Sequence, residues 1–201
     1  MAVLEGVKSA SRRAFVRTGL TVGATLSGAA VVGSTPARSQ PASPERDIDI
    51  LNFALLLEHL QAAFYREVLR RDELRGEVRR FAQVCGANEE EHVSLLREAL
   101  GPKARRRPSF RFDDALLRPR RFVRSALILE DAGVAAYNGQ AANLTPEALL
   151  PALRMVSVEG RHAAWIRDIA GEDPAPFAAD QGMSASAVTS LLKRAGLLVM
   201  R

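Results

Sequence analysis

The sequence predicts an all-α protein built on an antiparallel four-helix bundle. Ala, Leu, Arg and Glu dominate its 201 residues, and aromatic residues make up only 5%, a composition that favours helices. Val, Ile and Thr form none of the alternating runs that are typical of strands. Apolar residues recur instead at helical spacing over four long segments, at about 48–71, 76–100, 119–143 and 146–170.

Glycine, proline and a capping residue mark the ends of these helices. Gly101 ends the second helix, Thr145 is the predicted N-cap of the fourth, and Gly171 ends the fourth. The connection over residues 101–118 is much longer than the other two. It predicts a crossover that lets the third helix begin at the opposite end of the bundle.

The chain divides into four parts on this interpretation. We expect a signal peptide over 1–39, a Pro/Ser-rich linker over 40–47 and the bundle over 48–171. Residues 172–201 form a C-terminal extension with a short helix at about 184–197. We expect this helix to pack on the bundle, and contact with a partner is the alternative.

The predicted leader has the features of an export signal. Residues 11–16, S-R-R-A-F-V, resemble the twin-arginine signal, and a mildly apolar run follows over 18–33. Small residues at Ala37 and Ser39 precede a predicted cleavage point near Gln40. We therefore expect a periplasmic or otherwise exported protein that meets the twin-arginine translocation machinery. An uncleaved anchor or a chance arginine pair is the alternative.

The leader also accounts for most of the positive charge. It holds five basic residues and one acidic residue, so it carries +4 of the formal +5. The remaining chain is near +1, which removes the argument for nucleic acid. A run of basic residues over 103–107 remains, without the interleaved aromatic residues of a nucleic-acid surface. We predict no nucleic-acid partner and no stable membrane insertion after cleavage, and a homo-oligomer stays open.

The first and third helices repeat one pattern. A-L-L-L-E-H-L-Q-A-A-F-Y at 54–65 parallels A-L-I-L-E-D-A-G-V-A-A-Y at 126–137, which places Glu58 and Glu130 at equivalent points on apolar stripes. A carboxylate in an apolar core is costly unless it is protonated, paired or bound to metal. The repeat therefore indicates a shared purpose for both acids.

The second and fourth helices each carry a Glu-x-x-His motif, whose spacing places a carboxylate and an imidazole on one helix face. Gaps of 31 residues from Glu58 to Glu89 and 29 from Glu130 to Glu159 put all these groups at similar depth in an antiparallel bundle. Four carboxylates and two imidazoles can hold two divalent ions, with Glu58 and Glu130 as the predicted bridges. The six predicted ligands are Glu58, Glu89, His92, Glu130, Glu159 and His162.

This pattern, over about residues 48–171, resembles the ferritin-like superfamily of di-iron and di-manganese carboxylate proteins. With its leader, the chain is similar to the exported bacterial members that include the desiccation-related group. The resemblance implies that the six residues are metal ligands and that the cofactor is two divalent ions, iron first and manganese next. A metal-free relic bundle is the alternative. The superfamily implies no single reaction, because its members range from ferroxidases and catalases to proteins of unknown role.

Four other residues near the motifs have predicted roles. Tyr65 and Tyr137, each two turns beyond a predicted bridging acid, are either packed core residues or hydrogen-bond donors and redox relays beside the ligands. His59 lies about 100° round the helix from Glu58, and we expect it to be a surface histidine or a neighbour of the ligands and not a ligand itself. Cys85, the only cysteine, excludes an internal disulfide and is expected to be inert packing.

Three functions fit this sequence. The leading hypothesis is an exported di-metal oxidoreductase whose small-molecule oxidant is oxygen or peroxide; it oxidises Fe(II) or decomposes peroxide in metal or oxidative-stress handling. The second is a non-catalytic stress or binding protein whose metal site is structural or vestigial. Iron storage in a shell is the third, although the sequence contains no clear nucleation patch. Small residues near the ligands, Gly86, Gly133 and Gly160 among them, either leave room for a substrate or allow close helix packing.

Overall fold

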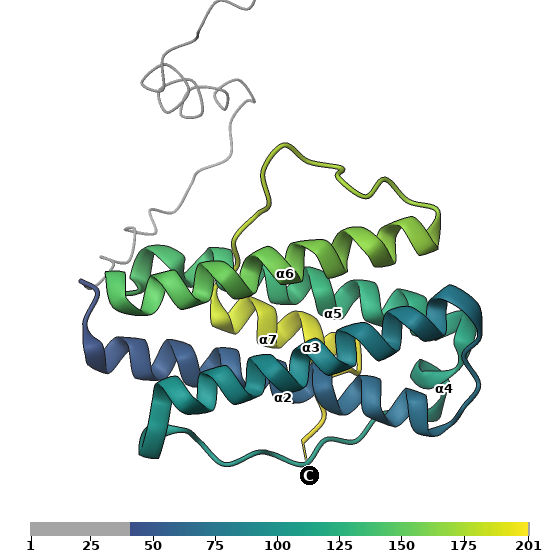
Figure 1. Ribbon diagram of the computed structural model, residues 1–201, viewed down its shortest axis with the longest axis horizontal. Helices are drawn as coiled ribbons and strands as arrows, with labels where there is room; N and C mark the ends of the chain where they lie inside the picture. Colours follow the sequence, from purple (N-terminus) through teal and green to yellow (C-terminus); the bar gives the residue numbers. More distant parts are fainter. Residues whose placement is uncertain (1–40, 201) are drawn as a thin grey trace, which may run out of the picture. The chain divides into compact units, whose positions relative to one another are not determined.

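A computed structural model describes residues 41–200 of the chain, and it confirms the all-α bundle (Figure 1). The predicted signal peptide and its cleavage point lie outside the described residues. Two helical hairpins pack against each other, and each is joined by a short turn. The four long helices are α2 (Pro44–Arg70), α3 (Gly76–Leu100), α5 (Pro119–Gln140) and α6 (Pro146–Ala170).

The connection between the hairpins is the crossover that the sequence predicts. After α3 the chain forms a short 3-10 turn, η1 (Gly101–Lys103), and it later forms the four-residue helix α4 (Asp114–Leu117). Figure 1 shows the intervening segment running back along the length of the bundle. As a result α5 runs in the same direction as α3, and α2 and α6 run the opposite way.

Helix α2 begins earlier than predicted. It starts at Pro44, and Ser43 accepts a hydrogen bond from the Arg46 amide at 3.3 Å. Residues 44–47 are therefore helical and do not belong to a linker. A Ser-Pro pair is typical of linkers, but a serine cap followed by proline in the first turn is also typical of a helix start.

Thr145, the residue that precedes α6, is bonded to a residue of another helix. Thr145 occupies the predicted N-cap position, but its side chain makes no capping bond to α6. Its hydroxyl and amide donate to the carboxylate of Asp47 in α2, at 2.5 and 3.0 Å. This contact ties the first turns of α2 and α6 together. After α5, residues 141–143 form a 3-10 turn, η2 (Ala141–Asn143), where the sequence predicts more α-helix.

Two apolar clusters fill the bundle at different depths. The larger one contains Phe64, Phe81 and Phe122, all fully buried, with neighbouring aromatic rings 5.7 to 6.4 Å apart. The smaller one is built from residues that include Leu55 and Leu96. In α3 and α6 the predicted metal ligands fall between the residues that supply the two clusters, whereas in α2 and α5 Glu58 and Glu130 are flanked by residues of the larger cluster. We call the level of these ligands in the bundle the polar layer.

The C-terminal helix α7 (Ala185–Arg194) packs against α5, as predicted, although it ends three residues early. Val188, Leu192 and Leu197 are buried in the larger apolar cluster. Beyond α7, the amide of Arg111 in the crossover donates to the carbonyl of Val199 at 3.0 Å. Among residues 41–200, no helix combines the length and hydropathy that crossing a membrane requires.

Candidate metal centre

Six polar side chains converge in the polar layer, one acid each from α2 and α5 and a Glu-x-x-His pair each from α3 and α6. The four carboxylates are fully buried, and the two imidazoles are at most 5% exposed. They are the six residues that the sequence pattern predicts, namely Glu58, Glu89, His92, Glu130, Glu159 and His162.

These side chains form two overlapping groups, each with ligand atoms within 4.8 Å of one another. One hairpin contributes Glu58 and His92 to the first group, and the other contributes Glu130 and His162 to the second. Glu89 and Glu159 belong to both groups. We call Glu58 and Glu130 the outer carboxylates, and Glu89 and Glu159 the shared carboxylates.

The predicted bridging assignment is therefore wrong in this geometry. Glu58 and Glu130 were expected to bridge, yet each belongs to one group only, and the shared positions fall to the acids of the Glu-x-x-His motifs. The physical reason is the pairing of the helices. Each outer carboxylate faces the histidine of its own hairpin, whereas α3 and α6 bring their acids together in the middle of the bundle. Helical periodicity predicts the level of these groups along the bundle, but it does not predict which groups lie next to one another.

Both imidazoles present Nδ1 to the carboxylates. His92 Nδ1 lies 2.9 Å from Glu89, 3.3 Å from Glu58 and 3.2 Å from Glu159. His162 Nδ1 lies 3.0 Å from Glu89 and 3.3 Å from Glu130. Glu89 is the carboxylate that both nitrogens face, and each nitrogen faces a different oxygen of it.

Several of these atoms lack hydrogen bonds although they are buried. Within the described part of the chain, one oxygen each of Glu89, Glu130 and Glu159, together with His162 Nδ1, has no hydrogen-bond partner. Buried polar atoms are nearly always satisfied, so such a group needs an explanation. Oxygen and imidazole nitrogen donors that face a common point fit divalent cations such as Fe(II) or Mn(II). The donor set thus fits metal ions.

The electrostatics show how the cluster balances its charge without metal. Burial and the Glu58 charge raise the pKa of Glu159 to about 7, and burial with the Glu159 charge raises the pKa of Glu89 well above its usual value. Burial opposes the charge on His92, but its carboxylate neighbours outweigh burial and raise its pKa to about 12. Protons on the shared carboxylates and histidines thus take the place of cations.

Glu58 titrates in the opposite direction. Burial raises its pKa, but the neighbouring His92 outweighs burial and holds the pKa of Glu58 below its usual value. Two divalent ions would match the four negative charges of the carboxylates with both histidines neutral. Metal binding would therefore release the protons that the cluster holds.

The two tyrosines donate to the outer carboxylates across the bundle. Tyr137 of α5 donates to Glu58 Oε1 of α2 at 2.6 Å, and Tyr65 of α2 donates to Glu130 Oε1 of α5. Burial raises the pKa of both phenols well above the usual value, so they remain protonated donors. The predicted role as hydrogen-bond donors beside the ligands agrees with these contacts, and a redox role stays a prediction.

Two polar neighbours were not found by sequence reasoning. The side-chain nitrogen of Asn88 lies 2.9 Å from His162 Nε2, on the side of the ring away from the carboxylates. An amide can donate to or accept from either tautomer, so Asn88 can orient this ring. Gln61 donates to Glu159 Oε2 at 3.4 Å. Their positions in the sequence could have indicated these contacts, because Asn88 directly precedes a motif acid and Gln61 lies one turn after Glu58.

The glycines near the cluster serve close packing more than open space. A methyl group at Gly133 would lie 2.5 Å from Glu159 Oε2, and one at Gly86 would lie 3.0 Å from Tyr65 Cβ. Gly160, in contrast, has no neighbour within 4 Å of such a methyl group. Of the predicted small-residue positions, Gly133 is the one that makes room for a candidate ligand.

His59 and Cys85 lie near the cluster but outside both groups. His59 is buried, not on the surface, and burial lowers its pKa, so it is a neutral core histidine. Burial raises the pKa of the Cys85 thiol to about 12, which agrees with inert packing.

Comparison with known families gives one match. A family model described as a ferritin-like domain matches residues 46–172. This span contains all six clustered side chains and nearly all of the four long helices. The comparison with curated proteins finds no match.

Proposed function

The chain belongs to the ferritin-like domain family, and from this premise we propose that its centre binds two divalent metal ions. Each ion would take one outer carboxylate and one histidine, and both ions would use the shared carboxylates. The observation that carries this proposal is the pair of overlapping groups of buried donors. The ligands would be Glu58 and His92 for one ion, Glu130 and His162 for the other, and Glu89 and Glu159 for both.

We further propose that the loaded centre is a redox site that oxidises Fe(II) with oxygen or peroxide or decomposes peroxide. A pair of bound iron or manganese ions would supply the electrons and the Lewis acidity for these reactions. The protein supplies the rest. Tyr65 and Tyr137 hold the outer carboxylates, Gln61 and Asn88 hold a shared carboxylate and a histidine, and the apolar clusters on both sides exclude bulk water.

A direct test loads the metal-free protein with Fe(II) under anaerobic conditions and follows oxygen or peroxide consumption. The matched control is Glu130→Ala/Glu159→Ala, which removes one outer and one shared carboxylate. We expect the wild-type protein to consume oxygen or peroxide faster than this variant does. A parallel assay follows peroxide consumption after loading with Mn(II). Consumption equal to that of free Fe(II) in both proteins would contradict catalysis.

A structural role for the metal is the second candidate, and the closed geometry favours it. The six side chains are at most 5% exposed, and a closed site is typical of structural metals, whereas a catalytic site keeps an open position. On this account metal raises the thermal stability of the wild-type protein, and the centre adds nothing to the rate of Fe(II) oxidation. The same loaded samples distinguish the two candidates.

We also propose that the protein reaches the periplasm by the twin-arginine route, as an exported ferritin-like protein of the desiccation-related kind. The support is the S-R-R-A-F-V sequence at 11–16 and the small residues before Gln40. Loading in the cytoplasm before export would protect the choice of metal from competition outside. Equal export of an Arg12→Lys/Arg13→Lys variant would argue against this route.

A further inference from the structure

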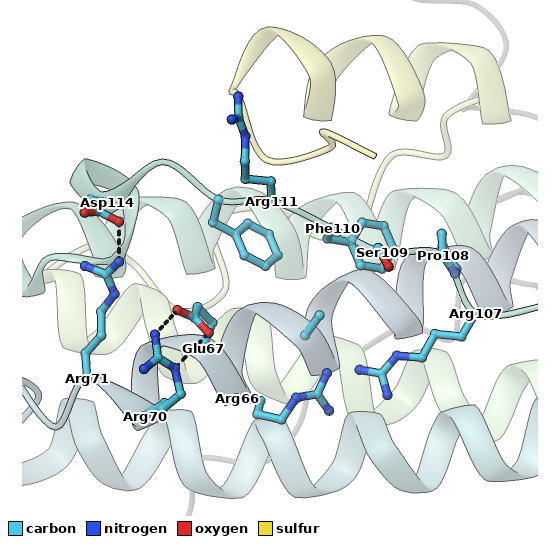
Figure 2. A pocket seen from close by; sticks show the side chains of 12 residues that line it. Arg66, Glu67, Arg70, Arg71, Arg107, Pro108, Ser109, Phe110, Arg111 and Asp114 are labelled. Atoms are coloured by element: carbon cyan, nitrogen blue, oxygen red, sulfur yellow. Dashed lines mark hydrogen bonds and ion pairs between the residues drawn. The ribbon is translucent and has the colours of Figure 1, made fainter. Parts of the chain in front are cut away.

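A groove away from the centre lies between α2 and the crossover, and its volume is about 720 Å³. Residues of α2 form one side, and residues 107–112 of the crossover form the other (Figure 2). The groove is lined by five arginines and two acidic residues. No local sequence pattern links the two sides, because they are about forty positions apart in the chain.

Four of the guanidinium groups follow the groove in a row. Figure 2 shows Arg71, Arg70 and Arg66 along α2, followed by Arg107, which extends toward Arg66 from the crossover. Arg66 and Arg70 are one helical turn apart, about 6 Å along the helix axis. Arg111 also lines the groove, but its side chain points away from this row (Figure 2).

The row is only partly neutralised. Glu67 pairs with Arg70 at 2.7 Å, and Asp114 pairs with Arg71. Arg66 pairs with Glu90 on α3, at 2.5 Å. Arg107 forms no ion pair with any residue in the described range 41–200. Arg107 thus brings a positive charge without an acidic partner toward the paired Arg66, an arrangement that an anion between the two guanidinium groups would stabilise.

The crossover side of the groove is held in place by the core. Phe112 packs edge-on against the fully buried Phe64, with ring centroids 5.4 Å apart, and Phe110 stacks near Phe112 at 6.5 Å. The backbone between them is bonded to the C-terminal segment through Arg111 and Val199. These contacts hold residues 110–112 of the crossover side in place, beginning three positions after Arg107.

We propose that this groove binds a phosphate ester or anhydride that carries more than one negative charge. The planar guanidinium fork matches phosphate oxygens in pairs, and a row of such groups favours a ligand with several charges. The volume exceeds what one inorganic phosphate needs and falls in the range of small-molecule sites, about 300–1,000 Å³. Ala63 and the phenylalanines give the ligand an apolar side to lie against. The site is separate from the metal centre and does not rest on the proposed function.

Binding of pyrophosphate by the purified chain, measured by equilibrium dialysis at low ionic strength, tests the proposal. Arg107→Gln should weaken binding at least tenfold, because it removes a charge-assisted contact. Arg106→Gln is the matched control, since it removes the same charge from the same segment outside the groove, and it should change affinity less than twofold. Ala63→Leu keeps every charge but fills part of the groove, and it should also weaken binding. All three variants keep the metal centre, so pyrophosphate held there cannot mimic the result.

A second arm identifies the source of the phosphate. Sedimentation with vesicles that contain cardiolipin, a lipid with two phosphodiester groups, against phosphatidylcholine vesicles tests a lipid headgroup. Binding to cardiolipin that Arg107→Gln abolishes and Arg106→Gln spares would support the groove as a headgroup site. Equal losses in the two arginine variants would overturn the proposal, because they indicate diffuse attraction. Failure of both pyrophosphate and cardiolipin to bind would overturn it as well.

Discussion

The hydroxyl of Tyr137 donates to Glu58 Oε1 at 2.6 Å, from a helix of the opposite hairpin. Tyr65 makes the reciprocal contact with Glu130 Oε1. In both outer carboxylates the second oxygen, Oε2, faces the histidine of its own hairpin, at 3.3 Å. Each tyrosine therefore fixes one oxygen of an outer carboxylate and leaves the other free for a metal ion.

This relationship predicts the effect of Tyr137→Phe. The variant keeps the ring and loses only the donor, so the outer carboxylate Glu58 is oriented less well. Loss of such an orienting hydrogen bond typically costs about 10- to 100-fold in metal affinity or activity. Chelator competition should show weaker Mn(II) binding, and Tyr65→Phe should have a comparable effect through Glu130. Unchanged metal affinity and oxidation kinetics in both variants would argue for core packing alone.

The two kinds of carboxylate should differ in metal stoichiometry. Glu58→Ala removes a donor from one group, whereas Glu89→Ala removes a donor from both. We expect Glu58→Ala to keep one well-bound ion and Glu89→Ala to weaken both. Metal analysis after gel filtration measures this difference. The reverse order would restore the sequence-based assignment of Glu58 as a bridge.

Gly133→Ala should disturb the centre, because its methyl group would lie 2.5 Å from the buried oxygen of Glu159. Overpacking of this kind typically costs about 1–3 kcal/mol. Gly160→Ala is the control, with no neighbour within 4 Å of the new methyl group. In a helix that substitution gains up to about 1 kcal/mol. Thermal melts and metal content should therefore fall for the first variant only, and equal behaviour would show that Gly133 does not make room for Glu159.

The pH dependence of stability follows from the raised pKa values. Glu159, with its pKa raised from 4.5 to about 7, binds more protons in the folded state, so its contribution to metal-free stability is lost as pH rises through this interval. The raised pKa of His92 acts in the same direction above about 6.5. The lowered pKa of Glu58 matters only at acid pH, where its contribution is lost as pH falls.

Metal ions displace these protons, so they bind more tightly as pH rises. The increase in melting temperature on adding Mn(II) should therefore grow between about pH 5.5 and pH 7.5. Glu130→Ala/Glu159→Ala should show little increase at either pH. An increase in the wild-type protein that does not change with pH would contradict proton displacement at this cluster.

Most of the fold could be predicted from the sequence, because helical periodicity and the residues that begin or end helices report on local structure. The four helices, the crossover and the packing of α7 were predicted in this way. The start of α2 was missed because the Ser43-Pro44 pair serves both as linker composition and as a helix start. The role of Thr145 was missed because its partner, Asp47, lies 98 residues away.

The convergence of the six polar groups was predicted from two motifs and two nearly equal gaps. The motifs and gaps do not predict which carboxylates belong to both groups, because that depends on which helices face each other in the bundle. The crossed contacts of Tyr65 and Tyr137 have the same origin, since periodicity places each ring two turns from an acid of its own helix. The groove beside Arg107 also requires the path of the crossover, which no local pattern specifies.

The central claim is that the buried cluster holds two metal ions, and metal content tests it most directly. Mass spectrometry should compare mature protein, purified from its native compartment, with folded Glu130→Ala/Glu159→Ala. The account predicts about two iron or manganese ions per chain in the native protein and loss of both in the variant. A native protein without bound metal, whose thermal stability does not change on adding Fe(II) or Mn(II), would contradict it.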